Sequence, residues 1–406
     1  MSSSTDSPAD ATAVRRGNLS LVLRQVAARG PCARTEIAAV TGLAHATVTA
    51  LVADLMARGL IREDGAAATG GRGRPRRRLR LVPERVRTVA VHATWEGVEV
   101  VTADLSGELV DVGYVPQRGP FGPRDLWADA IAAAVKPALE PGAGRHLGSL
   151  VIAVAGPVTR GPARPDPPRL GASAATLEAM VAERLPGVEC PVVVANDADM
   201  AAVAEYHALL EGRAEPPDSI AYIKSDAGVA GGLVIDGRIH RGSHGLAGSF
   251  GHLPVSLDGP RCGCGGRGCL NSYLSTGAVF EAAGLDGLAA DQGKNAALAE
   301  LDLRLRGGEP DALTALDRAG HALGAAIQAV AAATDVDEFV LGGHLAAWAP
   351  WLTPGVDIRL GPRRAAFPAV PLRVTPGVLG LRATLHGAVR TGHERVLADP
   401  GSVPPG

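Results

Sequence analysis

The chain has 406 residues, of which 46% are hydrophobic and 20% are charged. This composition excludes global disorder and predicts two or three folded units. No apolar run reaches the ~18 residues that a membrane span needs, and the polar start lacks the apolar stretch of a secretory signal. We therefore expect a cytoplasmic protein with no membrane association.

The net charge of −2 conceals an uneven distribution along the chain. Residues 1–90 hold 15 arginines, no lysine and 7 acidic residues, a net charge of +8. The remainder holds 25 basic and 35 acidic residues, a net charge of −10. A basic head on an acidic body indicates contact with a polyanion, although a merely solvated head would have the same composition.

The periodicity predicts successive segments along the chain. We expect a disordered Ser/Asp/Ala-rich tail at 1–14, a helical domain at 15–66, a Gly/Arg-rich basic wing or linker at 67–83, and an α/β domain at 84–406. Strands and helices recur in a similar order in the two halves of the last domain. This order predicts two related lobes with a cleft between them.

Residues 34–55 have the pattern of a helix-turn-helix. Ala38 is small where the two helices meet, and Gly42 lies where the turn requires a positive φ. The core of this unit is expected to comprise Ile37, Leu43, Val48, Leu51 and Leu55. An ordinary helical hairpin is the alternative.

The N-terminal end of the second helix is expected to enter the major groove of DNA. Its side chains are small and mostly uncharged, so they allow close approach and contact with thymine methyl groups but include no bidentate base reader. The expected DNA contacts are Thr35, Ala44, His45, Ala46, Thr47 and Thr49. Most of the affinity must then come from phosphate contacts made elsewhere.

The segment 72–78 reads Arg-Gly-Arg-Pro-Arg-Arg-Arg and is the expected source of those contacts. Such a thin, extended strip fits a narrow A·T minor groove, with Arg72, Arg74 and Arg76 as the contacting residues. A flexible basic linker is the alternative. In either case the charge predicts DNA binding that weakens steeply with salt.

A cluster of potential metal ligands follows in the second half. His252, Cys262, Cys264 and Cys269 have the spacing His-x9-Cys-x-Cys-x4-Cys, with glycines between the cysteines. Three thiolates and one imidazole suit a structural, tetrahedral Zn²⁺ with no open position, whereas free cysteines in a Gly-rich loop are the alternative. The other cysteines are expected to be small buried hydrophobic residues, Cys32 and Cys190.

Together these residues resemble the ROK family of repressors, uncharacterised reading frames and sugar kinases, over roughly residues 16–400. The most specific element is Gly251-His252 with the loop Cys262-x-Cys-Gly-x-x-Gly-Cys-Leu270. The resemblance also rests on Arg16-Gly-Asn18, Thr41-Gly-Leu43, Gly73-Arg-Pro75, Ala155-Gly-Pro-Val158, Asn196-Asp197, Gly231-Gly232, Asp236-Gly237, Arg241-Gly242, Gly245-x-Ala-Gly248 and Leu341-Gly-Gly343. It implies an α/β fold with an actin/hexokinase-like pair of lobes, preceded by a small winged helix-turn-helix. The lobes are expected to be split near residue 196, with the C-terminal helix packing back on the first lobe. The resemblance also implies a sugar-binding cleft and a homodimer or tetramer.

Two nucleotide-binding loops of the family's kinases are altered. His92-Ala-Thr-Trp-Glu96 replaces Asp-x-Gly-Gly-Thr, and Asp226-Ala-Gly-Val-Ala-Gly-Gly232 replaces Gly-Thr-Gly-x-Gly-Gly-Gly. Asp226 would put a carboxylate where a phosphate should sit. We therefore expect no enzymatic activity, with Asp197 a vestigial form of the kinases' general base. Alternatively, Asn196-Asp197 only caps the following helix.

The resemblance places an effector site in the cleft, at Gly156, Asn196, Asp197, Ser249, His252 and Asn271. Ser249 and Asn271 stand where the family has two glutamates. Losing two charge-assisted hydrogen bonds costs about 3–6 kcal/mol, on the order of 10²–10⁴ in affinity. Either the ligand is anionic, modified or larger than a neutral hexose, or ligand control has been lost.

The sequence thus predicts a transcriptional regulator, expected to repress carbohydrate-related genes. It would bind a palindromic, A·T-rich operator in double-stranded DNA, under the control of a sugar-type effector. The alternatives are an ATP-dependent sugar kinase of the ROK family and a constitutive DNA-binding protein with a ligand-blind body.

Overall fold

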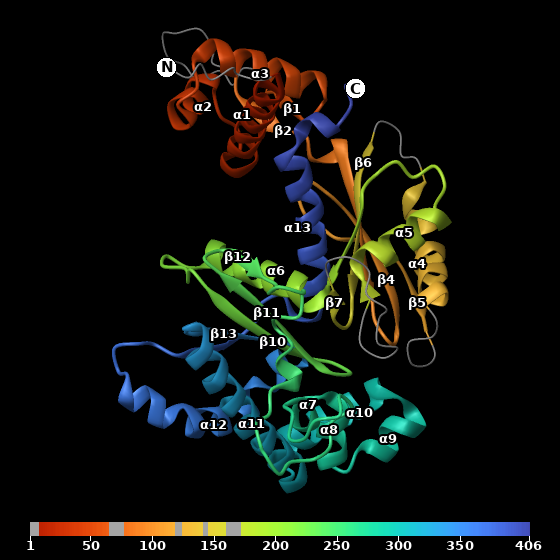
Figure 1. The fold of residues 1–406 in the computed structure, drawn as a ribbon, viewed down its shortest axis with the longest axis vertical. Coiled ribbons are helices and arrows are strands. Elements are labelled where there is room, and N and C mark those ends of the chain that lie inside the picture. The colour runs from red at the N-terminus through yellow and green to blue at the C-terminus, as the bar shows by residue number, and fades with distance from the viewer. Residues whose placement is uncertain (1–7, 65–76, 118–123, 141–144, 160–171) are drawn as a thin grey trace, which may run out of the picture.

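The structure is a computed structural model that describes residues 8–64, 77–117, 124–140, 145–159 and 172–406. Figure 1 shows a helical N-terminal unit, followed by two larger lobes that each contain a β-sheet. The long helix α13 (Ala383–Ala398) runs from between the lobes to the N-terminal unit. The α/β class and the two-lobed architecture expected from the sequence are confirmed.

The N-terminal unit combines helices with a β-hairpin. Its elements are α1 (Pro8–Arg29), α2 (Arg34–Thr41), α3 (His45–Ala57), β1 (Ile61–Glu63) and β2 (Leu79–Leu81). Gly42 ends α2 with a φ of 70°, the left-handed conformation that the turn into α3 requires. Ile37, Val48, Leu51 and Leu55 are buried in the core of this unit, and Ala38 and Leu43 pack against it. The predicted helix-turn-helix is confirmed.

Helix α1 begins earlier than the sequence suggests. Residues 1–14 are expected to form a disordered tail, but α1 starts at Pro8, so residues 8–14 are helical. Proline is favourable in the first turn of a helix, and the alanines at positions 9, 11 and 13 are the strongest helix formers. Residues 11–14 are exposed and belong to a helix that Leu19, Val22 and Leu23 anchor in the core.

The first lobe is built on a mixed sheet with the strand order β5-β4-β3-β6-β9. Its strands are β3 (Val86–Ala93), β4 (Gly97–Asp104), β5 (Val110–Pro116), β6 (His146–Val154) and β9 (Val192–Asn196). The parallel strands β3, β6 and β9 are covered on both faces, which explains their runs of Val, Ile and Ala. Helices α4 (Arg124–Leu139) and α5 (Ala174–Arg184) cover one face, and α13 covers the other.

The second lobe has a sheet of the order β12-β11-β10-β13-β14. Its strands are β10 (Ile220–Ser225), β11 (Val229–Ile235), β12 (Arg238–His240), β13 (Glu338–Gly343) and β14 (Arg373–Pro376). Helices α11 (Pro310–Thr334) and α12 (His344–Ala366) cover one face, and α6 (Asp197–Gly212) covers the other. The shorter elements are β7 (Val158–Thr159), β8 (Ala172–Ser173), α7 (Asn271–Leu274), α8 (Thr276–Ala282), α9 (Asp286–Gln292), α10 (Lys294–Gly307), and the 3₁₀ turns at Pro83–Arg85, Phe250–His252, Gly380–Arg382 and Pro400–Ser402.

Helices α6 and α13 lie against each other between the two sheets (Figure 1). A side chain at Gly387 on α13 would place its Cβ 1.9 Å from the carbonyl oxygen of Met200 on α6, so only glycine allows this close contact. Strand β9 of the first lobe ends at Asn196, and α6 begins at the next residue. The chain therefore passes from one lobe to the other at this point.

The C-terminal end of the chain is part of the N-terminal unit's core. Val396 on α13 and Val403 after it are buried with the side chains of α1, α2 and α3. Arg24 Nη1 on α1 donates a 3.0 Å hydrogen bond to Glu394, and Arg58 Nη1 donates to the Val403 carbonyl at 2.6 Å. Helix α13 thus packs against α6 between the lobes and, at its other end, against the N-terminal unit.

Among the residues described, no single helix is long and apolar enough to cross a membrane. The bent pair α2 and α3 meets the same length and composition limits only when the two helices are taken together. Apolar side chains of this pair, including Ile37, Val48 and Val52, pack in the N-terminal core.

Candidate functional site

The N-terminal end of α3 presents a small, exposed and carboxylate-free surface. Ala44, His45, Ala46 and Thr49 are exposed, Thr47 is half-buried, and Thr35 is exposed on α2. Thr49 Oγ1 donates a 2.9 Å hydrogen bond to the His45 carbonyl, which holds that hydroxyl against its own helix. Because no acidic side chain occurs between residues 44 and 53, no negative charge on this stretch would repel a phosphate backbone.

The hairpin of the N-terminal unit carries arginines anchored by acidic neighbours. Arg34 and Arg77 each donate a 2.7 Å hydrogen bond to the Glu63 carboxylate, and these bonds lower its pKa. Arg80 Nε lies 2.9 Å from Asp64 Oδ1 at the base of the same hairpin. The predicted contacts Arg72, Arg74 and Arg76 lie outside the described residues, so their roles remain predictions.

The predicted metal ligands converge. One potential ligand atom from each of His252, Cys262, Cys264 and Cys269 lies within 4.8 Å of all the others. Cys262 Sγ is 3.7 Å from His252 Nδ1, and Cys264 Sγ is 3.7 Å from Cys269 Sγ. Sulfur ligands at ~2.3 Å in a tetrahedron stand about 3.7 Å apart, so this donor set has the size and chemistry of a four-ligand zinc site.

A glycine-dependent turn folds the metal-binding loop back on the chain before it. Gly268 has a φ of 60°, and a Cβ there would lie 1.7 Å from the Ser256 carbonyl oxygen. The Gly268 carbonyl accepts a 2.8 Å hydrogen bond from the Val255 amide. The ligand Cys269 and the segment around Val255 and Ser256 are therefore held together.

Asn196 has a structural role at the start of α6. Its Nδ2 donates a 2.7 Å hydrogen bond to the Gly156 carbonyl, and its Oδ1 accepts from the Asp199 amide at 3.0 Å. The second bond is a helix N-cap, as the capping alternative requires. Gly156 and Asn196 are thus brought together, with both polar atoms of the asparagine amide engaged in the fold.

Asp197 lies in a buried charge cluster that capping does not explain. The residue is 2% exposed, and its Oδ2 contacts Lys224 Nζ on β10 and lies 3.4 Å from His92 Nε2 on β3. Burial alone would raise the pKa of Asp197, but the charge of Lys224 and the hydrogen bond from His92 outweigh it and lower the pKa to about 2. A carboxylate neutralised by a lysine is a poor general base.

A second cluster fills the other altered loop. Lys294 Nζ contacts the Asp226 carboxylate and lies 2.6 Å from Glu96 Oε1, and His344 Nε2 lies 3.9 Å from Asp226 Oδ1. Burial disfavours the charged forms of Asp226 and Lys294, but their mutual attraction lowers the pKa of Asp226 and raises that of Lys294. Charged side chains of the protein itself therefore fill the space beside both loops. In the kinases, these loops bind the nucleotide phosphates.

The two residues that replace glutamates are engaged locally. Ser249 is exposed and donates a 2.7 Å hydrogen bond to the Leu246 carbonyl. Asn271 Oδ1 accepts a 2.8 Å hydrogen bond from the Val229 amide, at the start of β11. The structure thus brings Gly156, Asn196 and Asp197 together, whereas His252 belongs to the metal cluster and Asn271 braces a strand.

Sequence reasoning missed Lys224 and Lys294 as residues of the cleft. The signal was present, because the chain has only three lysines among its 40 basic residues and two of them lie here. Their partners could not be assigned in the same way, since Asp197 and Glu96 are far from them in sequence.

The described fold is that of a helix-turn-helix unit joined to a two-lobed α/β body that carries a Cys₃His cluster. Residues 89–391 match the model of the ROK family, and residues 20–73 match that of the MarR family. The first match covers well over half of the chain. The chain belongs to the ROK family.

The relatives include both repressors and kinases. The xylose repressor of Bacillus subtilis (strain 168) is 26% identical over 277 residues, which are 67% of this chain and 69% of the repressor. The kanosamine kinase of Amycolatopsis mediterranei (strain S699) is 35% identical over 205 residues, which are 50% of this chain and 62% of the kinase.

Solved structures extend the comparison to nearly the whole fold. A ROK family transcriptional regulator, a homologue of the E. coli MLC protein, superposes with a TM-score of 0.74 at 21% identity, covering 95% of this chain and 98% of its own. The ROK family glucokinase of Streptomyces griseus, in complex with glucose and AMPPNP, has a TM-score of 0.58 at 26% identity and covers 76% of this chain and 99% of its own.

Proposed function

We propose that this protein is a transcriptional regulator, acting as a repressor of carbohydrate-related genes in the cytoplasm. The observation that carries the proposal is the exposed, carboxylate-free N-terminal end of α3, within a head that has a net charge of +8. The similarity to the xylose repressor supports it, because that match covers 69% of the repressor.

The proposed partner is a palindromic, A·T-rich operator bound by a homodimer or tetramer. Two copies of the head related by a two-fold axis would read two half-sites about one helical turn apart. The arginines at positions 72, 74 and 76 would enter a narrow minor groove beside each half-site. Phosphate contacts would supply most of the affinity, because α3 has no bidentate base reader.

We propose that a sugar-type or related effector controls this binding through α13. Thr384 Oγ1, near the start of α13, donates a 3.2 Å hydrogen bond to the Asp197 carbonyl. Glu394, ten residues further on, pairs with Arg24 of the N-terminal unit. An effector that changes the angle between the lobes would therefore shift the head through one rigid helix.

We propose a structural Zn²⁺ at His252, Cys262, Cys264 and Cys269. Four protein ligands leave no open coordination position, so the ion would hold the loop rather than activate a substrate. The tight turn at Gly268 links this loop to residues 254–256, so the metal would also fix that segment.

A sugar kinase is the second candidate, and the match to the kanosamine kinase favours it. The site favours the regulator instead. Asp197 is paired with Lys224, and Asp226 and Glu96 surround Lys294 where nucleotide phosphates would need space and positive charge. We therefore propose that this protein is not an enzyme.

Fluorescence anisotropy with labelled promoter fragments from its own genome tests the proposal. We expect tight binding to a few fragments, weakened at least tenfold by Ala46→Asp, which sets a carboxylate against the phosphates. The matched control is Ala57→Asp, because it adds the same charge on the same face of α3 about 16 Å further along. Wild-type protein that binds all fragments alike, or two variants that bind alike, would contradict the proposal.

A further inference from the structure

A pocket of about 600 Å³ lies outside the interlobe cleft, between α11, α12 and the segment that precedes the metal-binding loop. Small-molecule sites in proteins commonly measure 300–1,000 Å³. The space left in the cleft beside His92, Lys224 and Asp226 is only about 30 Å³. The pocket on the second lobe is therefore much larger than the space in this part of the cleft.

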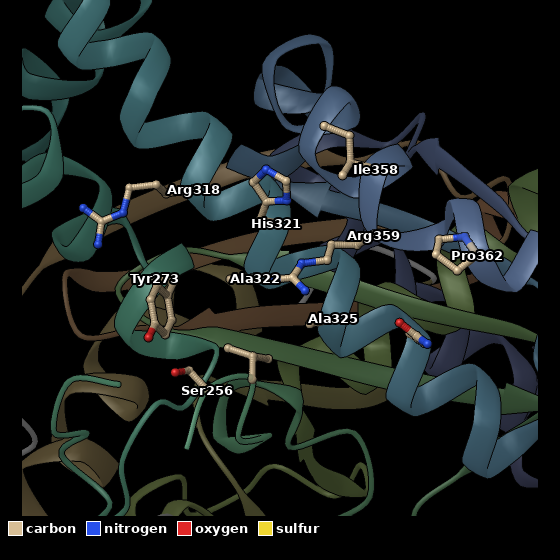
Figure 2. A pocket seen from close by; sticks show the side chains of 11 residues that line it. Ser256, Tyr273, Arg318, His321, Ala322, Ala325, Ile358, Arg359 and Pro362 are labelled. Carbon is tan, nitrogen blue, oxygen red and sulfur yellow. The ribbon is translucent and has the colours of Figure 1, made fainter. Parts of the chain in front are cut away.

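The walls of this pocket combine an apolar surface with polar side chains. Figure 2 shows Arg318, His321 and Arg359 on the helices at one side, with Tyr273 and Ser256 on the opposite side. The apolar part of the lining comprises Val255, Ala322, Ala325, Ile358 and Pro362. Such a lining suits a molecule that has a carbon body and a few strongly polar groups.

Two arginines give the pocket its charge. Arg318 and Arg359 are exposed, and neither makes a salt bridge or a side-chain hydrogen bond within the part of the chain that the structure describes. The acidic neighbour of Arg318 is Asp317, which lies 3.6 Å from His321 Nε2 instead. Both guanidinium groups are thus available to hold a phosphate or carboxylate.

The backbone around the pocket is fixed on both sides. A Cβ at Gly324 of α11 would lie 2.7 Å from Arg359 Cβ, so this glycine lets α12 bring the arginine close to α11. On the other side, a Cβ at Gly259 would lie 2.4 Å from the Tyr273 hydroxyl, which places that ring against the metal-binding loop. The pocket is therefore a built feature of the packed second lobe.

We propose that this pocket binds a small organic anion, whose phosphate or carboxylate contacts Arg318 and Arg359 and whose carbon body packs on Ala322, Ala325 and Ile358. The proposal does not depend on the effector site in the cleft. A phosphorylated sugar and a free organic acid share this chemistry, and the probes below separate them.

Isothermal titration calorimetry of the full-length protein at low ionic strength tests the proposal. The probes are glucose 6-phosphate and citrate, with inorganic phosphate as an anion without a carbon body and glucose as a body without a charge. We expect saturable binding of at least one of the two organic anions, tighter than that of inorganic phosphate, and no binding of glucose in this pocket.

Two variants locate that binding. Arg318→Gln and Arg359→Gln should each weaken it by about 10- to 100-fold, the loss expected for one charge-assisted contact. Arg363→Gln, one turn further along α12, is the matched control and should leave the affinity unchanged. Circular dichroism verifies that each variant is folded.

Several outcomes would overturn the proposal. The proposal fails if neither organic anion binds, or if binding survives both arginine variants. It also fails if Lys294→Met abolishes binding while Arg359→Gln does not, because the anion would then lie in the cleft. The proposal is also overturned if Arg359→Gln leaves anion binding unchanged but alters the sedimentation coefficient of the protein. The pocket would then be a contact between copies of the chain.

Discussion

Lys294 Nζ of the second lobe lies 2.6 Å from Glu96 Oε1 of the first, so this ion pair spans the cleft. The other cleft lysine, Lys224, pairs with Asp197 in a much drier place. Side-chain exposure is 9% for Lys224 and 3% for Asp197, against 22% for Lys294 and 47% for Glu96. We therefore expect the buried Lys224–Asp197 pair to contribute more to the free energy of unfolding than the partly solvated Lys294–Glu96 pair.

Replacing Lys224 by Met should destabilise the protein by about 3–5 kcal/mol, because it leaves the buried Asp197 carboxylate without its cation. The matched variant Lys294→Met should cost about 1 kcal/mol, because its partners are partly solvated. Urea unfolding at pH 7 measures both free energies. Adding Asp197→Leu to Lys224→Met should restore most of the loss, and equal losses in the two single variants would contradict this description of the cleft.

ATP should not be consumed by this protein in the presence of sugars. The phosphate loops are filled by Lys294 and Asp226, and the position of the catalytic base is held by the ion-paired Asp197. A coupled assay for ADP release across a panel of hexoses and amino sugars should stay at background. A turnover that Asp197→Asn abolishes would show that the cleft is a working kinase site.

Zinc content should depend on the cysteines of the cluster and not on the others. Cys264→Ser removes one of the four ligands and should lower the zinc content well below one ion per chain, with a loss of stability. Cys190→Ser, outside the cluster, is the control and should retain the metal. Elemental analysis of the purified proteins decides, and full zinc retention by Cys264→Ser would be incompatible with the proposed site.

Stability should fall between pH 6.5 and pH 4. Burial lowers the pKa of His393 on α13 to about 4, and its Nε2 is buried without a hydrogen-bond partner among the described residues. The unfolded chain takes up this proton near its ordinary pKa of 6.5, before the native state does. The free energy of unfolding then drops by up to about 1.4 kcal/mol per pH unit.

Urea unfolding at pH 7 and pH 5 measures this effect. The drop should be smaller in His393→Gln than in the wild type. It should not vanish, because burial also lowers the pKa of His207 to about 4. An unchanged pH dependence in His393→Gln would refute the role given to this histidine.

Local signals predicted much of the fold and the metal site. Gly42 and the apolar spacing around it define the helix-turn-helix, and the cysteine spacing defines the metal cluster, because both depend on residues close in sequence. Helix α12 was not predicted, since Pro350, Pro354 and Pro362 normally interrupt a helix. Its packing on α11 through buried residues such as Leu352 outweighs that preference.

Contacts between distant segments could not be predicted. His92 and Asp197 are 105 positions apart, and Arg24 and Glu394 are 370 apart. No local pattern assigns such partners, since they depend on how the lobes and the head pack. The scarcity of lysine marks Lys224 and Lys294 as unusual without identifying the carboxylates that they contact.

As a regulator, this protein is expected to recognise particular DNA sequences. The most direct measurement incubates the purified full-length protein with sheared DNA from its own genome, recovers the bound fragments and sequences them. We predict strong enrichment of a few fragments that share a two-fold symmetric, A·T-rich site, lost in Ala46→Asp. Recovered fragments with the same composition as the input, at low and at physiological salt, would contradict the account.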